Sequence, residues 1–293
     1  MVKRTSSTNQ LHRKGIVDVI ILIILLLVCL TTLYPLVNML FISLSSMEEV
    51  VKSSGFMLYP KKINFEGYNY VFNHVGLLKA YQTTIFITVV GTAINLLMTT
   101  LGAYVLSVRD MPGRNFLMTV VIITMFFGGG LIPSYLVIKS LGMINTVWSL
   151  MIPGAISAWL LVLMRNFFQG VPKELRESAR IDGCSEMKTL THIMLPLSMP
   201  IIATLTLFYG VTHWNEYLNV IIYINNNKIN TLQVLLRTMY ASNNLEIDGD
   251  RLPPPVETIR SATVMLTAIP IICVYPFLQK YFVQGIMVGS LKG

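Results

Sequence analysis

The chain has 293 residues, of which 54% are hydrophobic and only 12% are charged, whereas an ordinary globular chain carries roughly 25% charged residues. Together with a mean hydropathy of +0.64, this composition argues against a soluble protein and predicts a chain whose solvent is lipid. The net charge of +8 is typical of cationic loops beside an anionic cytoplasmic leaflet, so we do not expect a nucleic-acid partner.

A transmembrane helix needs about 20 predominantly apolar residues, and the sequence contains six such runs. We therefore predict an all-α, polytopic membrane helix bundle of six transmembrane helices over residues 16–282, with tails at residues 1–15 and 283–293. The first run is too long for a signal peptide and lacks a small-x-small cleavage site, so we expect it to stay uncleaved. In chain order, the predicted spans are Ile16 to about Leu40, Tyr81–Leu106, Phe116–Ile138, Val147–Met164, Leu197–Ile224 and Ala262–Phe282.

Basic residues in the loops predict the orientation of the bundle. If the N-terminus lies inside, 13 of the 22 Lys and Arg residues fall in inner segments, counting Lys280 at the inner end of the last span, and nine fall in outer segments. Cytoplasmic loops carry such an excess, so an N-in, C-in topology with two cytoplasmic tails is favoured. The outer loops are also the long ones, and the rule is weaker for long loops.

The sequence lacks the motifs of an enzyme. It contains no H-E-x-x-H, no G-x-S-x-G, no acidic calcium loop and no Gly-Lys dipeptide, and therefore no Walker A loop. The three cysteines and four histidines are too scattered for a zinc site or a disulfide framework. We expect no catalytic residue and no metal site, and any ATP-driven work would need an ATPase on another polypeptide. The only acidic residues in the spans are Asp18 and Glu216, whereas an ion-coupled transporter usually needs more buried ionisable groups along its path.

The inner loop at residues 165–196 differs from the other loops. Pro172 suits the first turn of a short helix, Gly183 can take the left-handed conformation that ends it, and Ser185 can cap a second short helix. We expect Ser178 and Ala179 to expose a small-residue surface that another protein can approach closely. From composition alone, an amphipathic helix resting among lipid headgroups explains the loop equally well.

The spacing favours a protein partner. The loop resembles the EAA motif (E-A-A-x3-G-x9-I-x-L-P) of bacterial ABC importer permeases, with all landmarks in register and Ser178 in place of the first alanine. Three further segments, Ala179–Gly183, Trp214–Tyr217 and Val283–Gly293, are similar to the sugar-importer branch of this family. Phe127–Pro133 resembles its polysaccharide and multiple-sugar subgroup.

The resemblance implies a multi-pass permease of type I ABC importer architecture in a bacterial cell membrane. A second permease would complete a heterodimer, two ATPase subunits would bind ATP and Mg, and an extracellular solute-binding protein would deliver an oligosaccharide. This chain itself would bind no cofactor. The inner loop would be the helix that couples to the ATPase, through Glu177, Ser178, Ala179, Asp182, Gly183, Ile193 and Pro196. Two alternatives stay open. One is an ABC importer permease for a non-sugar cargo such as a peptide, and the other is a stand-alone secondary transporter or membrane enzyme.

Polar and aromatic residues within the spans are candidates for the substrate path. Aromatic faces stack on pyranose rings, amides and carboxylates bind hydroxyls, and polar groups in a span should face the bundle interior or a watery cavity. Hydrogen bonding between helices is the alternative explanation, and we favour it slightly for Glu216. The candidates are Trp214, Asn215, Glu216, Tyr217 and Tyr135, with Asn95 and Trp159 as weaker ones.

Two further segments have open interpretations. Gly128–Gly130 and Pro133 interrupt the third predicted span, either as a gating hinge or as a close-packing site with a kink. The polar, proline-rich outer segment from Asn225 to Arg260 either docks the binding protein or is an ordinary solvated loop.

Overall fold

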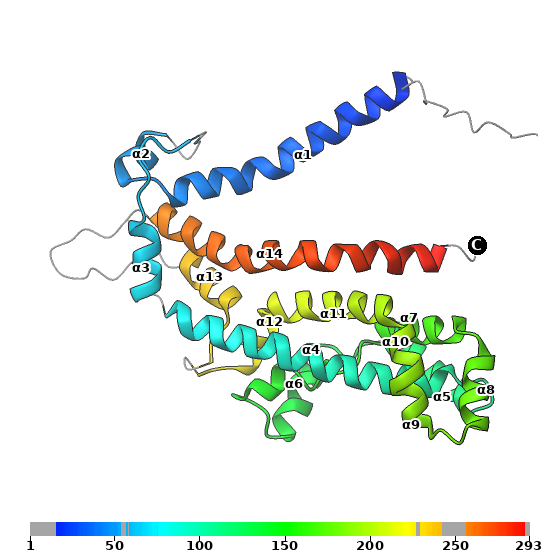
Figure 1. Cartoon of the computed structure of the whole chain (residues 1–293). Helices are drawn as coiled ribbons and strands as arrows, with labels where there is room; N and C mark the ends of the chain where they lie inside the picture. Colours follow the sequence, from blue (N-terminus) through cyan, green and yellow to red (C-terminus); the bar gives the residue numbers. More distant parts are fainter. Residues whose placement is uncertain are drawn as a thin grey trace, which may run out of the picture.

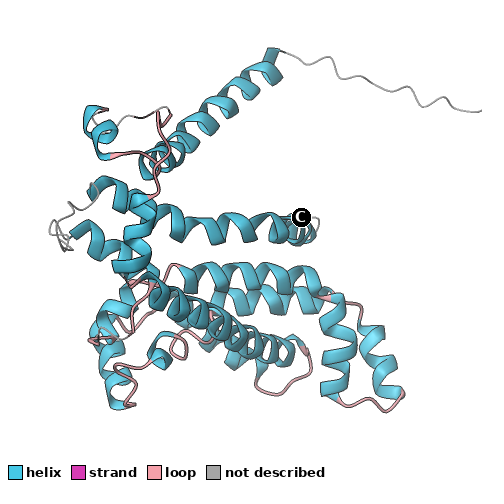
Figure 2. Ribbon diagram, turned by 60° about the vertical axis from the view of Figure 1, so that its left-hand side comes forward, coloured by secondary structure: helices cyan, strands magenta, loops and turns pink. Residues whose placement is uncertain are grey.

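The computed structural model of the chain is all helical over the residues that it describes, in agreement with the predicted all-α class (Figure 2). The predicted N-terminal tail, residues 1–15, lies outside the described residues, as does most of the distal part of the outer segment, residues 242–255. The described residues are 16–53, 57, 59–74, 76–226, 229–241 and 256–290.

Three helices are long and apolar enough to cross a membrane: α1 (Ile16–Ser43), α4 (Leu77–Ser107) and α14 (Val256–Ser290). At 1.5 Å per residue, the 31 residues of α4 extend about 46 Å, more than the hydrocarbon thickness of a bilayer. These helices agree with the first, second and sixth predicted spans. Because α14 continues to Ser290, residues 283–290 of the predicted C-terminal tail are a continuation of that helix.

The third predicted span is not a straight helix. It consists of α5 (Arg114–Phe126) and α6 (Leu131–Ser140), which are bent by 118° relative to each other at the glycine-rich break. A Cβ added to Gly128 or Gly130 would meet no atom within 4 Å, so nothing in this chain packs closely against these two positions. Gly130 instead contributes a left-handed φ of +82° at the start of α6, a conformation that L side chains rarely adopt.

The fourth and fifth predicted spans are also interrupted. The fourth begins as a single 3-10 turn, η1 (Val147–Leu150), passes through an irregular stretch with Pro153 and Gly154, and continues as α7 (Ala158–Gly170). The fifth consists of α11 (Met199–Trp214) and α12 (Leu218–Tyr223). Counting each bent helix pair as one span, the described residues contain up to five spans by length and composition.

The bundle is organised around α4, which packs against α7 and α11, while α14 packs against α1, α11 and α3 (Glu66–His74). Buried apolar side chains such as Met164, Phe168, Met194 and Leu205 fill the space between α4, α7 and α11. By contrast, α1 lies beside α14 (Figure 1), and none of its apolar window is buried within this chain. Its side chains therefore require lipid or another protein as their environment.

The two ends of the bundle differ in what they carry. The start of α1, the end of α14 and the short helices α8 (Lys173–Ile181) and α9 (Glu186–Thr189) lie at one end of the molecule (Figure 1). At the opposite end lie α2 (Met47–Lys52), α3 and α13 (Leu232–Ala241). Both described chain ends thus share one end of the bundle with the segment that carries the EAA-like spacing.

Candidate functional site

The first candidate site is the hairpin formed by α8 and α9. The Cys184 amide donates to the Ala179 carbonyl at 2.9 Å and the Gly183 amide to the Arg180 carbonyl at 3.1 Å, which is the Schellman pattern that ends a helix. Gly183 has a φ of +78°, so the predicted left-handed cap is confirmed. The Ser185 hydroxyl accepts from the Lys188 amide at 3.4 Å and caps α9, as predicted.

The second half of the hairpin leads directly into the bundle. After α9 the chain forms a π-helical turn at Leu190–Met194 and a short helix, α10 (Leu195–Leu197), before it turns by 84° into α11. Leu190 and Met194 are buried in the core between α4, α7 and α11. Ile193 is half-buried and Pro196 is exposed. The hairpin is therefore connected to packed core residues within one helical turn.

The proposed coupling residues of α8 divide into two groups. Glu177, Ser178 and Asp182 are exposed and so are accessible to a partner. Ala179 is only 4% exposed, so the expected small-residue surface does not include it. Its single methyl group instead sits inside the chain, where a longer side chain would push α8 outwards.

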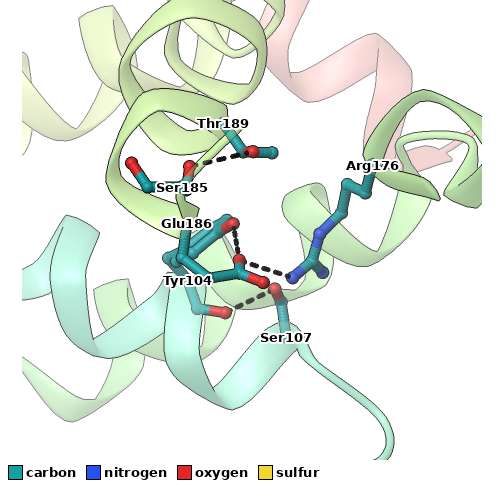
Figure 3. A network of polar contacts seen from close by, with 6 residues as sticks. All are labelled: Tyr104, Ser107, Arg176, Ser185, Glu186 and Thr189. Carbon is teal, nitrogen blue, oxygen red and sulfur yellow. Dashed lines mark hydrogen bonds and ion pairs between the residues drawn. The ribbon is translucent and has the colours of Figure 1, made fainter. Parts of the chain in front are cut away.

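A polar contact joins the hairpin to the end of α4 (Figure 3). The Tyr104 hydroxyl donates to Glu186 Oε2 at 2.5 Å, and Arg176 Nη2 lies 3.8 Å from the same oxygen. The Arg176 guanidinium carbon is 4.9 Å from the centroid of the Tyr104 ring. This contact was not predictable from the sequence, because Tyr104 and Glu186 are 82 residues apart and neither is a landmark residue of a motif.

The second candidate site is a cleft of about 290 Å³ in the middle of the bundle. Its walls come from α4, α11, α12, the start of α7 and the irregular segment before α7. The polar groups that line it include Asn95, Ser157, Tyr209, His213, Glu216 and Asn219. None of its lining residues is Lys or Arg, so the cleft presents neutral hydrogen-bonding groups and one carboxylate.

A break in the helix at residues 215–217 forms one wall of this cleft. Non-helical backbone at membrane depth is tolerated where it is buried in protein or lines a cavity. The freed groups find partners: the Asn219 amide donates to Glu216 Oε1 at 3.3 Å, and the Thr231 hydroxyl donates to the Glu216 carbonyl at 3.2 Å. Glu216 therefore stabilises the break and also faces the cleft.

Buried and part-buried hydrogen bonds hold other lining residues of the cleft together. Asn95 Nδ2 donates to the Gly154 carbonyl at 2.6 Å, which leaves Asn95 Oδ1 to accept from His213 Nε2 at 2.6 Å. The Ser157 amide donates to the Tyr209 hydroxyl at 3.1 Å, and that hydroxyl is 2.6 Å from Thr99 Oγ1. From the sequence, Asn95 is only a weak candidate and Tyr209 is not a candidate, because these contacts span 52 to 118 residues.

The structure brings only part of the predicted substrate path to the cleft. Glu216 lines it, and Tyr135 stacks on the lining residue Tyr223 with ring centroids 6.3 Å apart. Trp214 is 8% exposed and lies in a separate apolar cluster, where Nε1 donates to the Thr267 carbonyl at 3.3 Å.

The two remaining predicted path residues have partners outside the cleft. Asn215 Oδ1 accepts from Gln233 Nε2 at 3.2 Å, and Tyr217 contacts Arg237. In the part of the chain that the structure describes, no three His, Cys, Asp or Glu side chains are grouped to hold a metal ion.

Comparisons with known proteins identify the family. The model for "Binding-protein-dependent transport system inner membrane component" matches residues 7–288. The chain is 42% identical to the polygalacturonan/rhamnogalacturonan transport system permease protein YtcP of Bacillus subtilis (strain 168), over 94% of this chain and 98% of that protein. It is 43% identical to Protein LplC of the same organism, over 89% of this chain and 90% of that protein.

A solved structure is similar over the same extent. It is a chain from the crystal structure of a bacterial ABC transporter involved in the import of the acidic polysaccharide alginate, with a TM-score of 0.86 and 29% sequence identity. The match covers 96% of this chain and 100% of that chain. The likeness therefore extends over the whole bundle.

Proposed function

Because the chain belongs to the family of binding-protein-dependent transport system inner membrane components, we propose that it is the permease subunit through which an ATP-driven importer takes up an oligosaccharide. The family defines a multi-pass membrane subunit of a transport system and not an enzyme. The observation that carries the proposal is the exposed EAA-like hairpin, which is joined to a bundle containing a polar cleft. An oligosaccharide is the cargo class that the names of the similar proteins support.

The proposed assembly contains this chain, a second permease as its heterodimer partner, two ATPase subunits and an extracellular solute-binding protein. ATP and Mg would be bound by the ATPase subunits, which is consistent with a sequence that contains no Walker A loop. The apolar side chains of α1 are not buried within this chain. They leave a surface on which a second permease can pack, although lipid can cover the same surface.

The proposed topology has six spans with both termini in the cytoplasm. Its support comes from the excess of basic residues in the inner segments and from the shared position of the hairpin, the start of α1 and the end of α14 (Figure 1). In this topology the hairpin faces the ATPases and the cleft lies about midway along α4.

In the proposed coupling mechanism, the exposed Glu177, Ser178 and Asp182 contact the ATPase. Gly183 makes the tight turn between α8 and α9. Ile193 and Pro196 lie where the hairpin joins α11, so a displacement of the hairpin passes through them to the bundle. ATP binding would close the ATPase dimer, draw the hairpins together and turn the cleft outward, while binding-protein docking would bias the same two states from the other side.

Among the proposed substrate-path residues, Glu216 and Tyr135 have the best support, since one lines the cleft and the other stacks on its wall. Asn215 and Tyr217 lie in the same helix break as Glu216. Trp214 has the least support because its indole is buried in a cluster to which α3, α13 and α14 contribute.

The complete importer, reconstituted in liposomes with its binding protein and supplied with ATP, tests the proposal. We expect Glu177→Lys and Gly183→Pro to abolish ATP-driven uptake while the chain still inserts. The first reverses a charge at the proposed ATPase contact, and the second replaces the glycine at a φ of +78° with a residue locked near −65°. Asp110→Lys is a matched control, because Asp110 is an exposed acid on another inner loop.

Three outcomes of this experiment would contradict the proposal. Near-normal uptake in both hairpin variants would remove the coupling role, and uptake by this chain without any ATPase would indicate a stand-alone transporter. Competition by peptides but not by oligosaccharides would indicate the other cargo class.

A further inference from the structure

One helix, α4, contacts both the hairpin and the cleft. Tyr104 lies near its inner end, and Asn95 lies nine residues earlier, about 14 Å away along the helix axis. No proline interrupts α4 and its hydrogen-bonded run is continuous from Leu77 to Ser107. A helix of this kind moves as a rod, so a displacement applied at Tyr104 also displaces Asn95.

Three elements meet at a single carboxylate oxygen at the inner end of this rod. Glu186 belongs to α9, Arg176 to α8 and Tyr104 to α4, and both the hydroxyl and the guanidinium approach Glu186 Oε2 (Figure 3). The tyrosine is 6% exposed and its ring meets Phe168 edge-on at 6.2 Å, so its position is determined by the core. A hydrogen bond from a buried hydroxyl to a carboxylate is stronger than a neutral one.

The carboxylate of Glu186 is the part of this contact that is accessible to water. Its side chain is 67% exposed, whereas that of Arg176 is 22% exposed, so water competes for the carboxylate. An exposed ion pair at 3.8 Å contributes little by itself. Of the two polar contacts at this carboxylate, the Tyr104–Glu186 hydrogen bond is therefore the stronger, and it joins the hairpin directly to α4, while Arg176 orients the carboxylate from the side of α8.

The other part of α4 is attached to the walls of the cleft. Thr99 bonds to Tyr209, and Asn95 bonds to both His213 and the Gly154 carbonyl. Tyr209 and His213 belong to α11, and Gly154 belongs to the irregular segment before α7. Buried hydrogen bonds of this kind are costly to break, so a movement of α4 takes these cleft residues with it.

Resting on the proposed function, we propose that Tyr104 and Glu186 are positioning residues for transport, forming a latch that passes hairpin movement to α4 and thereby to the cleft. Glu186 lies outside the EAA-like landmarks, and Tyr104 is not among the predicted path residues. Coupling between two sites is reciprocal, so a change in the cleft also biases the hairpin through the same latch.

The experiment follows the opening of the cleft instead of sugar uptake. The complete importer carries Thr212→Cys as a reporter, because Thr212 is exposed and lines the cleft, in a background of Cys29→Ser, Cys184→Ser and Cys273→Ser. The reaction of the introduced thiol with a charged maleimide is measured with and without ATP, alongside the rate of ATP hydrolysis.

In Tyr104→Phe and in Glu186→Gln, we expect the ATP-dependent change in labelling to fall by about threefold to tenfold, as for the loss of one hydrogen bond of ordinary net strength, because water already competes for the exposed carboxylate. ATP hydrolysis should stay within about twofold of the parent, because the proposed ATPase contacts Glu177, Ser178 and Asp182 are unchanged. The double variant should be no worse than either single variant, because both remove one interaction. Tyr68→Phe is the matched control, since it removes a tyrosine hydroxyl that bonds to Ser43 at 2.8 Å away from the hairpin.

An unchanged labelling response in both latch variants would overturn the latch and leave the proposed function intact. Equal losses of labelling response and ATP hydrolysis would also overturn it, because they would indicate a structural role in assembly. If the parent with an intact latch shows no ATP-dependent labelling, or does not assemble with an ATPase, the proposed function fails and the latch with it.

Discussion

At Gly91 the absence of a side chain permits a close approach between two helices. The His213 ring of α11 lies directly against this position on α4, and a Cβ there would be 2.6 Å from His213 Nε2. That nitrogen also donates to Asn95 Oδ1. The glycine thus allows both the close packing of α4 on α11 and the hydrogen bond that shapes one wall of the cleft.

Gly91→Ala should therefore displace the imidazole and weaken its bond to Asn95. We expect a loss of stability of about 1–3 kcal/mol, typical of overpacking, together with reduced uptake. Thermal unfolding of the purified complex in detergent measures the first effect. Gly128→Ala is the control, because a Cβ there meets no atom within 4 Å; an equal loss of stability in both variants would contradict the packing argument.

At the scale of elements, the break between α11 and α12 gives Glu216 two roles that can be separated. Its carboxylate accepts from the Asn219 amide at the start of α12 and also lines the cleft. The first role needs only an acceptor oxygen, which glutamine also has. The second role, contact with cargo, also depends on the charge of the side chain and on whether the side chain can donate hydrogen bonds.

Glu216→Gln should keep the stability of the parent, whereas Glu216→Leu should lose about 0.5–1.5 kcal/mol with the hydrogen bond. If Glu216 contacts the cargo, Glu216→Gln also changes the KM for uptake at unchanged stability. Thermal unfolding together with uptake kinetics distinguishes the two roles. An unchanged KM in Glu216→Gln would assign the residue to the helix break alone, which is the explanation that the sequence slightly favoured.

At the scale of the whole molecule, the proposed topology places the hairpin inside the cell. Cys184 is exposed on the hairpin, and Tyr59 is 67% exposed in the segment between α2 and α3 at the opposite end. These two positions therefore lie on different sides of the membrane in an N-in, C-in chain. The reaction of a cysteine thiol at each position with a membrane-impermeant reagent shows on which side of the membrane that position lies.

With Cys29→Ser and Cys273→Ser, we expect a membrane-impermeant maleimide to label Cys184 in inside-out vesicles and not in intact cells. Tyr59→Cys, placed in a cysteine-free background, should show the opposite pattern. Labelling of Cys184 from outside intact cells would overturn the orientation and, with it, the proposed position of the ATPases.

The sequence predicts best where the signal is local. The apolar runs that became α1, α4 and α14 each lie within one stretch of about 20 to 30 residues, and the turn at Gly183 depends on hydrogen bonds over a few residues. Predictions were poorer where glycine, proline and polar residues interrupt an apolar run. Hydropathy detects such runs as spans but does not detect the 118° bend between α5 and α6 or the break at residues 215–217.

Composition and short-range spacing are enough to show that the chain is a helical membrane protein, that it lacks an ATPase motif of its own and that its inner loop carries an EAA-like spacing. The packing of the helices, by contrast, determines which polar residues meet. It turned Ala179 inward, buried Trp214 away from the cleft, and brought Tyr104 to Glu186 and Asn95 to His213. The physical reason is that these contacts join residues 82 and 118 positions apart, and their pairing depends on how whole helices pack and not on any local pattern.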